Sequence, residues 1–256
     1  METLLVERDQ GVVTVTLNRP DKKNAINTQM WDDLLETFEE VADRTDDRVV
    51  VVTGAGGAFC SGADLTDPRA TSSHQLVRMR HVADVALALH RVPKPTIAKV
   101  TGVAAGAGCN LALGCDLVVA SEQARFSEIF ARRGLTIDFG GSWVLPRLIG
   151  LHRAKELAFF ADILSAEQAA ELGLVNRVVA SGEIDEFVAD WARRLAAGPP
   201  LALSMTKTLL NGSFSVSMDE ALENEARCQA VNFTTADTTE AMTAFIEKRE
   251  PRYQGR

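Results

Sequence analysis

Two short runs of mostly β-branched residues, each ending in glycine, constrain the fold of this chain more than any other feature. The runs are RVVVVTG at residues 48–54 and PTIAKVTG at residues 95–102. Apolar runs of this length are typical of strands that are buried on both faces, as in parallel sheets. A helical pattern at residues 75–91, stopped by Pro93, separates the two runs. Because strand, glycine-rich turn, helix and strand follow one another, the sequence predicts an α/β fold.

Other segments extend this pattern on both sides. Residues 4–8 and 12–17 alternate around DQG and predict a hairpin. Thr28 is the expected N-cap of a helix that places Leu34, Phe38 and Val41 on one face. Residues 102–113 predict a turn followed by a helix, and CDLVVAS at residues 115–121 predicts a third strand.

From residue 142 onward the pattern is mostly helical, apart from a predicted strand in LVNRVV at residues 174–179. Helices are expected at residues 142–149, 153–161, 166–172, 183–197, 201–210, 218–228 and 238–248. The segment AAGPP at residues 196–200 marks a break. We therefore expect an α/β core at residues 1–197 and a C-terminal helical region at residues 198–256, which either covers the core or joins subunits.

Composition excludes some classes of protein. The net charge of −8 disfavours general nucleic-acid binding, which needs a basic face. The chain begins METLLVERDQ without an apolar signal region, and its longest uncharged run, between Lys99 and Asp116, is too short to span a membrane. The four cysteines form no C-x-x-C pair and no zinc pattern with histidine. These features predict a cytoplasmic protein with reduced thiols, no metal and no membrane contact.

The small-residue turns after the two runs, at residues 54–63 and 102–108, are the candidate ligand-binding segments. Neither completes G-x-G-x-x-G, no lysine follows at P-loop spacing, and Ser61 lacks the glycines of G-x-S-x-G. Two such turns at neighbouring strand ends can direct backbone N–H groups at one ligand oxygen. Close packing of helix on strand requires the same small residues, so local sequence leaves both interpretations open.

Six segments, in order, resemble the crotonase (enoyl-CoA hydratase/isomerase) superfamily over nearly the whole chain. They are VTLNRPDKKNAI, VVVVTGAGGAFCSGADL, KPTIAKVTGVAAGAGCNLALGCDLVVAS, ARFSEIFARRGLTIDFGGSWVLPRLIG, AEQAAELGLVNRVV and AFIEKREPRYQGR. The resemblance implies a crotonase-like spiral of ββα repeats with a C-terminal helical trimerisation region. It also implies homotrimers, or hexamers built as dimers of trimers, that bind acyl-CoA thioesters and stabilise a thioester enolate.

The resemblance assigns the catalytic positions. The backbone N–H groups of Ala63 and Ala107 become the two oxyanion donors. The family's two hydratase glutamates fall on Asn110, which cannot exchange a proton, and on Phe130. Glu128 is the carboxylate nearest to the second position and would need a local shift to replace it.

A different acid, Asp138, precedes FGG at residues 139–141. It occupies a slot that faces the acyl chain in several isomerases and in a dehalogenase of this superfamily. Burial among apolar neighbours would raise its pKa to a useful value. The alternative is that Asp138 only caps the helix that starts near Gly141.

The resemblance also implies positions that contact the CoA or acyl group of the substrate. Backbone near Ala25 and the segment from Ser61 to Leu65 are expected at the pantetheine and adenine, with Asp64 ordering this loop. Phe245 and Lys248, from this subunit or a neighbouring one, match residues near the nucleotide. The full set of expected substrate contacts is Ala25, Ser61, Asp64, Leu65, Gly106, Asn110, Phe130, Gly141, Phe245 and Lys248.

The number of carboxylates decides the expected reaction. Hydration works best with two acid–base groups, whereas moving a double bond from C3–C4 to C2–C3 needs one group that takes and returns a proton. We therefore expect an enoyl-CoA isomerase with Asp138 as base and without a cofactor, since CoA is part of the substrate. An enoyl-CoA hydratase and a non-catalytic acyl-CoA-binding protein remain the alternatives.

Overall fold

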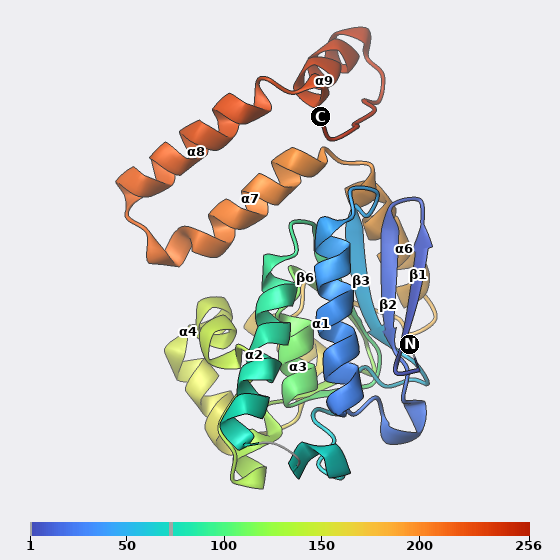
Figure 1. Cartoon of the computed structure of the whole chain (residues 1–256), viewed down its shortest axis with the longest axis vertical. Helices are drawn as coiled ribbons and strands as arrows, with labels where there is room; N and C mark the ends of the chain where they lie inside the picture. The colour runs from blue at the N-terminus through green and yellow to red at the C-terminus, as the bar shows by residue number, and fades with distance from the viewer. Residues whose placement is uncertain (1, 72–73) are drawn as a thin grey trace.

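The computed structural model describes residues 2–71 and 74–256 and is built on a six-stranded sheet (Figure 1). Its strand order is β1-β2-β3-β4-β6-β9. β1 and β2 form the predicted antiparallel hairpin, and the remaining neighbours pair in parallel. The strands are β1 (Leu4–Asp9), β2 (Val12–Leu17), β3 (Val49–Gly54), β4 (Thr96–Val100), β6 (Leu117–Ser121) and β9 (Arg177–Val179). The parallel order confirms the α/β class predicted from the two β-branched runs.

A second, smaller sheet was not predicted from the sequence. It has the order β5-β7-β8 and consists of β5 (Val103–Ala105), β7 (Arg125–Ser127) and β8 (Leu164–Ser165). These strands are two or three residues long, so alternation cannot reveal them. The segment expected to be only a turn before a helix therefore contains β5 between Gly102 and Gly106.

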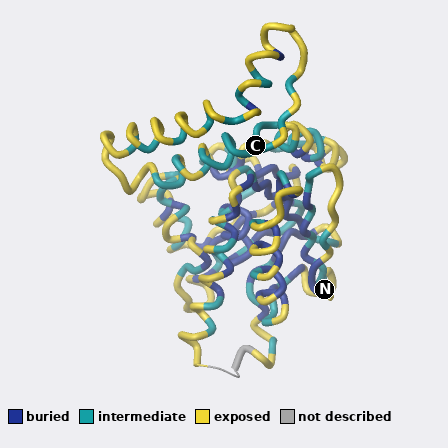
Figure 2. Tube along the Cα trace, turned by 45° about the horizontal axis from the view of Figure 1, so that its top comes forward, coloured by how far each residue is buried: buried dark blue, intermediate teal, exposed yellow. Residues whose placement is uncertain are grey.

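Helices cover both faces of the large sheet. One face packs on α1 (Thr28–Asp43), α2 (Gln75–Arg91) and α3 (Ala107–Leu113), with Phe38, Phe59 and Leu111 fully buried in the shared core. The other face packs on α6 (Ile184–Ala196), where Val51 and Ile97 meet side chains such as Val188. Figure 2 shows this buried interior in dark blue. Burial of each such side chain contributes about 1.5–3 kcal/mol to the stability of the fold. The packed layers thereby hold in place the ends of β3 and β4, where the two turns begin.

The N-terminus of α1 corrects one expectation. Asn27, not Thr28, is the N-cap, and its Oδ1 accepts a hydrogen bond from Met30 N–H at 3.0 Å. Thr28 is already the first helical residue, and both its N–H and its hydroxyl donate to Asp67 Oδ2 at 2.7 Å. Asn and Thr are both good caps, so sequence alone does not separate adjacent candidates.

The helices expected at residues 142–149 and 153–161 form α4 (Gly141–Phe160), interrupted at Gly150 with φ 75° and ψ 161°. α5 (Ala166–Leu172) follows with a capping box at Ser165 and Gln168. Short 3₁₀ helices complete the core at η1 (Pro20–Lys22), η2 (Pro68–Thr71) and η3 (Ile129–Arg133).

The C-terminal helices extend away from the core as an arm (Figure 1). The arm consists of α7 (Pro200–Gly212), η4 (Ser213–Ser215), α8 (Met218–Asn232) and α9 (Ala236–Glu247). Figure 2 shows the arm almost entirely exposed or half-buried, and neither α7 nor α8 has a buried residue. The division into a core at residues 1–197 and an oligomerisation region at residues 198–256 stays a prediction.

Among residues 2–71 and 74–256, none of the helices combines the length and apolarity needed to cross a bilayer. The same residues contain no cluster of three or more His, Cys, Asp or Glu side chains that could hold a metal ion.

Candidate active site

The first turn places the Ala63 amide on the side of its segment that faces away from Ile26. Ile26 N–H donates to Gly62 O at 2.8 Å, and Asp64 N–H donates to Ile26 O at 2.8 Å. In this parallel bridge both bonds to Ile26 come from residues that flank Ala63, so its own N–H points the other way. In the part of the chain that the structure describes, the Ala63 N–H donates to no protein acceptor.

The second turn begins α3 beside the first. Gly106 has φ 55° and ψ −128°, a conformation that strongly favours glycine, and Ala107 is the first residue of α3. The first N–H groups of a helix lack intrahelical acceptors, so the Ala107 N–H is free for a ligand. A Cβ on Gly62 would lie 2.9 Å from Ala105 O and 3.8 Å from Ala107 N. The two turns are therefore in direct contact, and only glycine fits between them.

Close packing, the other interpretation of the small residues, also occurs here. A Cβ on Gly108 would lie 2.5 Å from Cys60 O, so α3 rests against the segment after β3 without room for a side chain. Cys60 in turn pairs with Ala104 of β5 through a parallel bridge. Glycine thus serves packing at residue 108 and brings the two turns together at residue 62.

Asp138 does not cap α4. The N-cap of α4 is Gly140, which has no side-chain cap, and the Asp138 backbone oxygen accepts from Gly141 N–H at 3.0 Å. Its carboxylate oxygen Oδ1 is buried and has no hydrogen-bond partner within the described residues. Burial raises the pKa of Asp138 to about 6, although the positive charge of Arg78 on α2 opposes the shift. Asp138 therefore has the environment of an acid–base group.

Asn110 links Asp138 to α3. It is 1% exposed, and its Nδ2 donates to Asp138 O at 3.0 Å and to Glu128 Oε2 at 3.2 Å. Gly141 packs directly on this amide, since a Cβ there would lie 2.5 Å from Asn110 Oδ1. Because Asn110 lies one turn after Ala107, the Asp138 backbone is held one helical turn from the candidate amide donor.

Glu128 and Phe130 lie beside the second turn. Glu128 is 3% exposed, and burial raises its pKa to about 7, against the opposing effect of the Cys109 thiol and the Asn110 amide. Phe130, at the position of the second hydratase glutamate, packs on the turn: a Cβ on Gly106 would lie 3.7 Å from Phe130 Cζ. From sequence alone Glu128 was only a possible replacement for the second glutamate, because its burial and its bond to Asn110 are tertiary features.

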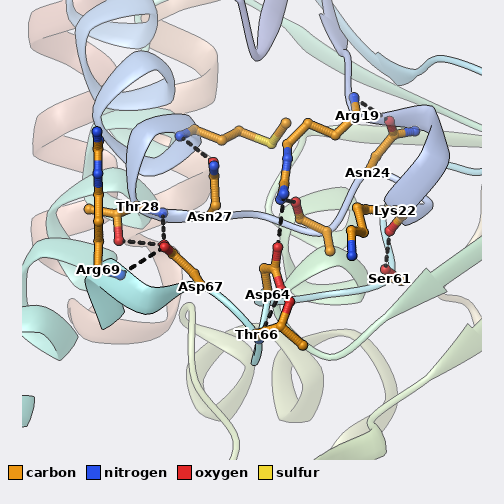
Figure 3. Close-up of polar contacts among 12 residues, drawn as sticks. Arg19, Lys22, Asn24, Asn27, Thr28, Ser61, Asp64, Thr66, Asp67 and Arg69 are labelled. Atoms are coloured by element: carbon orange, nitrogen blue, oxygen red, sulfur yellow. Dashed lines mark hydrogen bonds and ion pairs between the residues drawn. The ribbon is translucent and has the colours of Figure 1, made fainter. Parts of the chain in front are cut away.

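The expected CoA-contact loop is held by polar contacts that Figure 3 draws. Asp64 accepts from Arg19 Nη2 at 2.9 Å and from the Thr66 hydroxyl at 2.6 Å. Burial alone would raise the pKa of Asp64, but these hydrogen bonds and the Arg19 charge outweigh it and keep the pKa below its usual range. Asp64 is therefore engaged in ordering the loop, as the sequence suggests.

The neighbouring expected contacts are open to a ligand to different degrees. Ser61 Oγ donates to Lys22 O at 3.2 Å, and the Ala25 carbonyl accepts from the Arg19 guanidinium. Leu65 is 67% exposed on the same loop. Ala25, Ser61 and Leu65 thus lie together next to the Ala63 turn.

Phe245 and Lys248 are not brought to these residues within one chain. They lie at the end of α9, at the top of Figure 1, whereas the turns after β3 and β4 lie at the opposite end of the molecule. Phe245 is 83% exposed, and Lys248 is the left-handed C-cap of α9 with φ 55°. Within one chain, the end of α9 is therefore remote from the candidate site (Figure 1).

An apolar cavity begins beside the site and was not anticipated from the sequence. Phe139, which follows Asp138, lines a space of about 430 Å³ together with Leu87 and Trp143. Phe139 also stacks on Trp31 of α1, with ring centroids 5.6 Å apart. The residue after Asp138 therefore connects the candidate base to a space lined by α2 and α4.

Comparison with known proteins identifies the class to which this fold and site belong. The family model described as enoyl-CoA hydratase/isomerase matches residues 7–256. The chain is 37% identical over 261 residues to the 1,2-epoxyphenylacetyl-CoA isomerase of Escherichia coli strain K12, covering 100% of both chains. It is 33% identical to the short-chain-enoyl-CoA hydratase of Clostridium acetobutylicum over 252 residues, covering 98% of this chain and 97% of the relative.

A solved structure, the enoyl-CoA hydratase of Mycobacterium smegmatis, superposes with a TM-score of 0.92 at 37% identity and covers 98% of each chain. The chain belongs to the enoyl-CoA hydratase/isomerase, or crotonase, family. It is an enzyme of this family with the crotonase fold, and acyl-CoA thioesters are substrates consistent with that membership.

Proposed function

We propose that this enzyme is an enoyl-CoA isomerase that moves a double bond from C3–C4 to C2–C3 of an acyl-CoA thioester, with Asp138 as the base. One observation carries the proposal: the Asp138 carboxylate oxygen Oδ1 is buried and unpartnered within the described residues, while the Asp138 backbone carbonyl is held by Asn110, one turn from Ala107. The two positions that carry the hydratase glutamates in the family hold Asn110 and Phe130.

The proposed reaction uses three groups of this chain. The thioester oxygen accepts hydrogen bonds from the N–H groups of Ala63 and Ala107, which become stronger as negative charge develops on that oxygen. The Asp138 carboxylate takes a proton from C2, and the electron pair moves to the thioester as an enolate. The enolate then collapses with double-bond formation between C2 and C3, and Asp138 returns the proton to C4. No cofactor takes part, because the proton and the electron pair stay within substrate and base.

The pKa of Asp138 suits this role. At about 6 it leaves the carboxylate ionised at neutral pH, yet makes it more basic than an ordinary aspartate. Each oxyanion donor of this kind contributes about 2.7–4 kcal/mol of transition-state stabilisation. A relative named as an isomerase is consistent with this chemistry, although relatives named as hydratases match over the same length.

Hydration of 2-enoyl-CoA is the second candidate, and Glu128 is the observation that favours it. A second buried carboxyl with a raised pKa lies near Asp138, which would supply the two groups that hydration uses. Against this, Glu128 is bonded to Asn110 and lines an internal space rather than the apolar cavity.

The experiment supplies 3-enoyl-CoA and 2-enoyl-CoA in separate reactions and follows conjugated-thioester formation and water addition independently. The isomerase proposal expects fast conversion of the 3-enoyl substrate and slow hydration. Fast hydration would replace it with the hydratase proposal, and tight binding of both esters with neither reaction would indicate a non-catalytic acyl-CoA-binding protein.

We further propose that the arm assembles the chain into a homotrimer, or a hexamer built as a dimer of trimers. The arm exposes large apolar side chains far beyond what scattered surface residues require. They include Leu210 at 66%, Phe214 at 70%, Met218 at 74%, Phe233 at 68% and Ile246 at 78% exposure. In such an assembly Phe245 and Lys248 would come from a neighbouring copy to the CoA nucleotide. The cytoplasmic location expected from the sequence stays a prediction.

A further inference from the structure

We propose that Glu128 is a positioning residue for the proposed reaction: its carboxyl acts through the Asn110 amide to fix the backbone that aims the Asp138 carboxylate. The inference rests on the proposed role of Asp138 as base. It gives a role to Glu128, a buried acid that takes no part in the proposed proton transfer.

The Asn110 amide has two hydrogens, and both are engaged. One bonds to Glu128 Oε2 at 3.2 Å and the other to Asp138 O at 3.0 Å. With Gly141 packed against the same amide, the Asn110 side chain has little room to rotate. Removing the Glu128 acceptor frees one end of this link, and the bond to Asp138 then depends on Asn110 alone.

The segment after Asp138 needs an external hold. Phe139 and Gly140 have φ angles of 48° and 78°, so two successive residues adopt the left-handed conformation. For a phenylalanine this conformation is strained and persists only where surrounding contacts impose it. The bonds from Asn110 and from Gly141 N–H to the Asp138 carbonyl are such contacts, and they set the direction of the Asp138 side chain.

Glu128 does not reach an acyl group from its present position. It lines an internal space of about 10 Å³ with Cys109 and Leu145, enough for roughly one water molecule. The apolar cavity beside Phe139 is lined by other residues and does not include Glu128. Its place in the structure therefore fits support of the base rather than contact with substrate.

The charge state of Glu128 agrees with this role. The titratable groups that face it are the Cys109 thiol from α3, Asp138 from the segment before α4, and Asp162 at the same internal space. Burial, and then the negative charge of Asp138, raise the pKa of Glu128 to about 7. In either charge state the Glu128 carboxyl keeps an oxygen that accepts from Asn110, and the raised pKa lessens its negative charge beside Asp138.

The test compares two substitutions of similar volume in the isomerase assay with 3-enoyl-CoA. Glu128→Gln keeps an oxygen that accepts from Asn110 Nδ2, so kcat should stay within about threefold of the parent. Glu128→Leu removes the acceptor, so kcat should fall about tenfold or more, while KM stays within about twofold because substrate contacts are intact. Asp162→Asn is the matched control: it changes a carboxyl at the same internal space that is not bonded to Asn110, and should leave kcat unchanged.

A double-substitution cycle shows whether the two residues act as one unit. Asn110→Ala should lower kcat like Glu128→Leu, and the double variant should be no slower than the slower single variant. If Glu128→Leu does not fold, as judged by circular dichroism and thermal melting, the Asn110→Ala and Glu128→Gln variants decide the matter. The proposal expects a low kcat for Asn110→Ala and a kcat near that of the parent for Glu128→Gln.

Separate results would overturn the inference and the proposed function. A folded Glu128→Leu enzyme with parental kcat, a loss confined to KM, or equal damage from Gln and Leu would overturn the positioning role. Asp138→Asn is made in parallel: if it retains full turnover, the base has been misassigned and the proposed function fails. If Asp138→Asn is inactive and Glu128→Leu is not impaired, only the positioning role fails.

Discussion

The turns around Ala63 and Ala107 and the C-terminal arm lie at opposite ends of the molecule and differ in how tightly they pack (Figure 1). Around Ala63 and Ala107 the segments pack so closely that glycine is required at residues 62 and 108, and polar groups there are buried and fixed. In the arm, α7 and α8 have no fully buried residue, although Lys207 of α7 pairs with Asp116 of the core, and large apolar side chains are exposed. The contrast teaches that a single chain suffices to form the candidate catalytic groups, whereas the arm leaves apolar surface exposed that a partner would cover in the proposed assembly.

The largest expected effect comes from Asp138→Asn, which keeps the shape of the side chain and removes its basicity. Loss of a positioned general base typically costs about 10²–10⁴-fold in turnover. We expect kcat for 3-enoyl-CoA to fall within this range, with binding of a saturated acyl-CoA unchanged by calorimetry. Turnover close to that of the parent enzyme would show that the base is not Asp138, and the comparison with the arm would then lose its proposed catalytic group.

The next effect comes from Ala107→Pro, which removes one proposed oxyanion donor. Proline is tolerated at the first position of a helix, so α3 should survive the change. Loss of one such donor lowers kcat by about 10²–10³-fold. Ala166→Pro is the matched control, because it alters the first residue of α5, another seven-residue helix, away from the turns. Equal activity of both variants would exclude Ala107 as a donor.

A smaller effect concerns pH. Asp138 must be ionised to accept a proton, so kcat/KM should fall about tenfold per pH unit below about 6 and level off above it. Arg78→Met removes the positive charge that lowers the pKa of Asp138, so the acid limb should move to higher pH. Arg80→Met, on the same helix, is the control.

The pH profile is measured in the Glu128→Gln variant, because the pKa of Glu128 at about 7 lies in the same window. If Arg78→Met leaves the acid limb in place, or Arg80→Met moves it equally, the limb does not report Asp138.

The smallest expected effect on turnover belongs to the arm. Leu222→Asp places a charge among its exposed apolar side chains, and the mass measured by light scattering should fall from a trimer or hexamer towards a single chain. Glu225→Lys, a charge change on the same helix, should leave the mass unchanged. Dissociation should raise KM by a few fold while kcat changes little, because the proposed catalytic groups lie within one chain. A parent enzyme that is already a single chain would contradict the assembly proposal.

Much of the fold could be predicted from sequence because long patterns report burial directly. The β-branched runs became β3 and β4, and the interval left between the helices expected at residues 142–149 and 153–161 contains Gly150, where α4 is interrupted. The predictions that failed concerned features that depend on a few atoms or on residues far apart in the sequence. The three strands of the small sheet are too short for alternation to show, and Asn27 rather than Thr28 caps α1.

The candidate site divides in the same way. The family pattern assigned Ala63, Ala107 and Asp138, and in the structure Gly62 approaches the start of α3 while Asn110 of α3 bonds to the Asp138 backbone. The sequence pattern could not show that Asn110 bonds to Glu128, because the two residues are 18 positions apart and meet only through the packing of β7 on β5 and α3. Nor could it show that α9 leaves Phe245 far from the turns of its own chain.

The contact between Gly62 and the residues before Ala107 also bears on how such enzymes diversify. The proposed amide donors belong to the main chain, so substitutions other than proline at residues 63 and 107 leave them in place, whereas the neighbouring glycines tolerate almost no change. The positions that the family resemblance assigns to acid–base side chains are separate from these amides, at residues 110, 130 and 138, and in this chain only Asp138 is an acid. Under the proposed mechanism, substitutions at those three positions would change the proton chemistry and leave the two amide donors unaltered, which gives evolution or protein engineering a separate handle on the reaction.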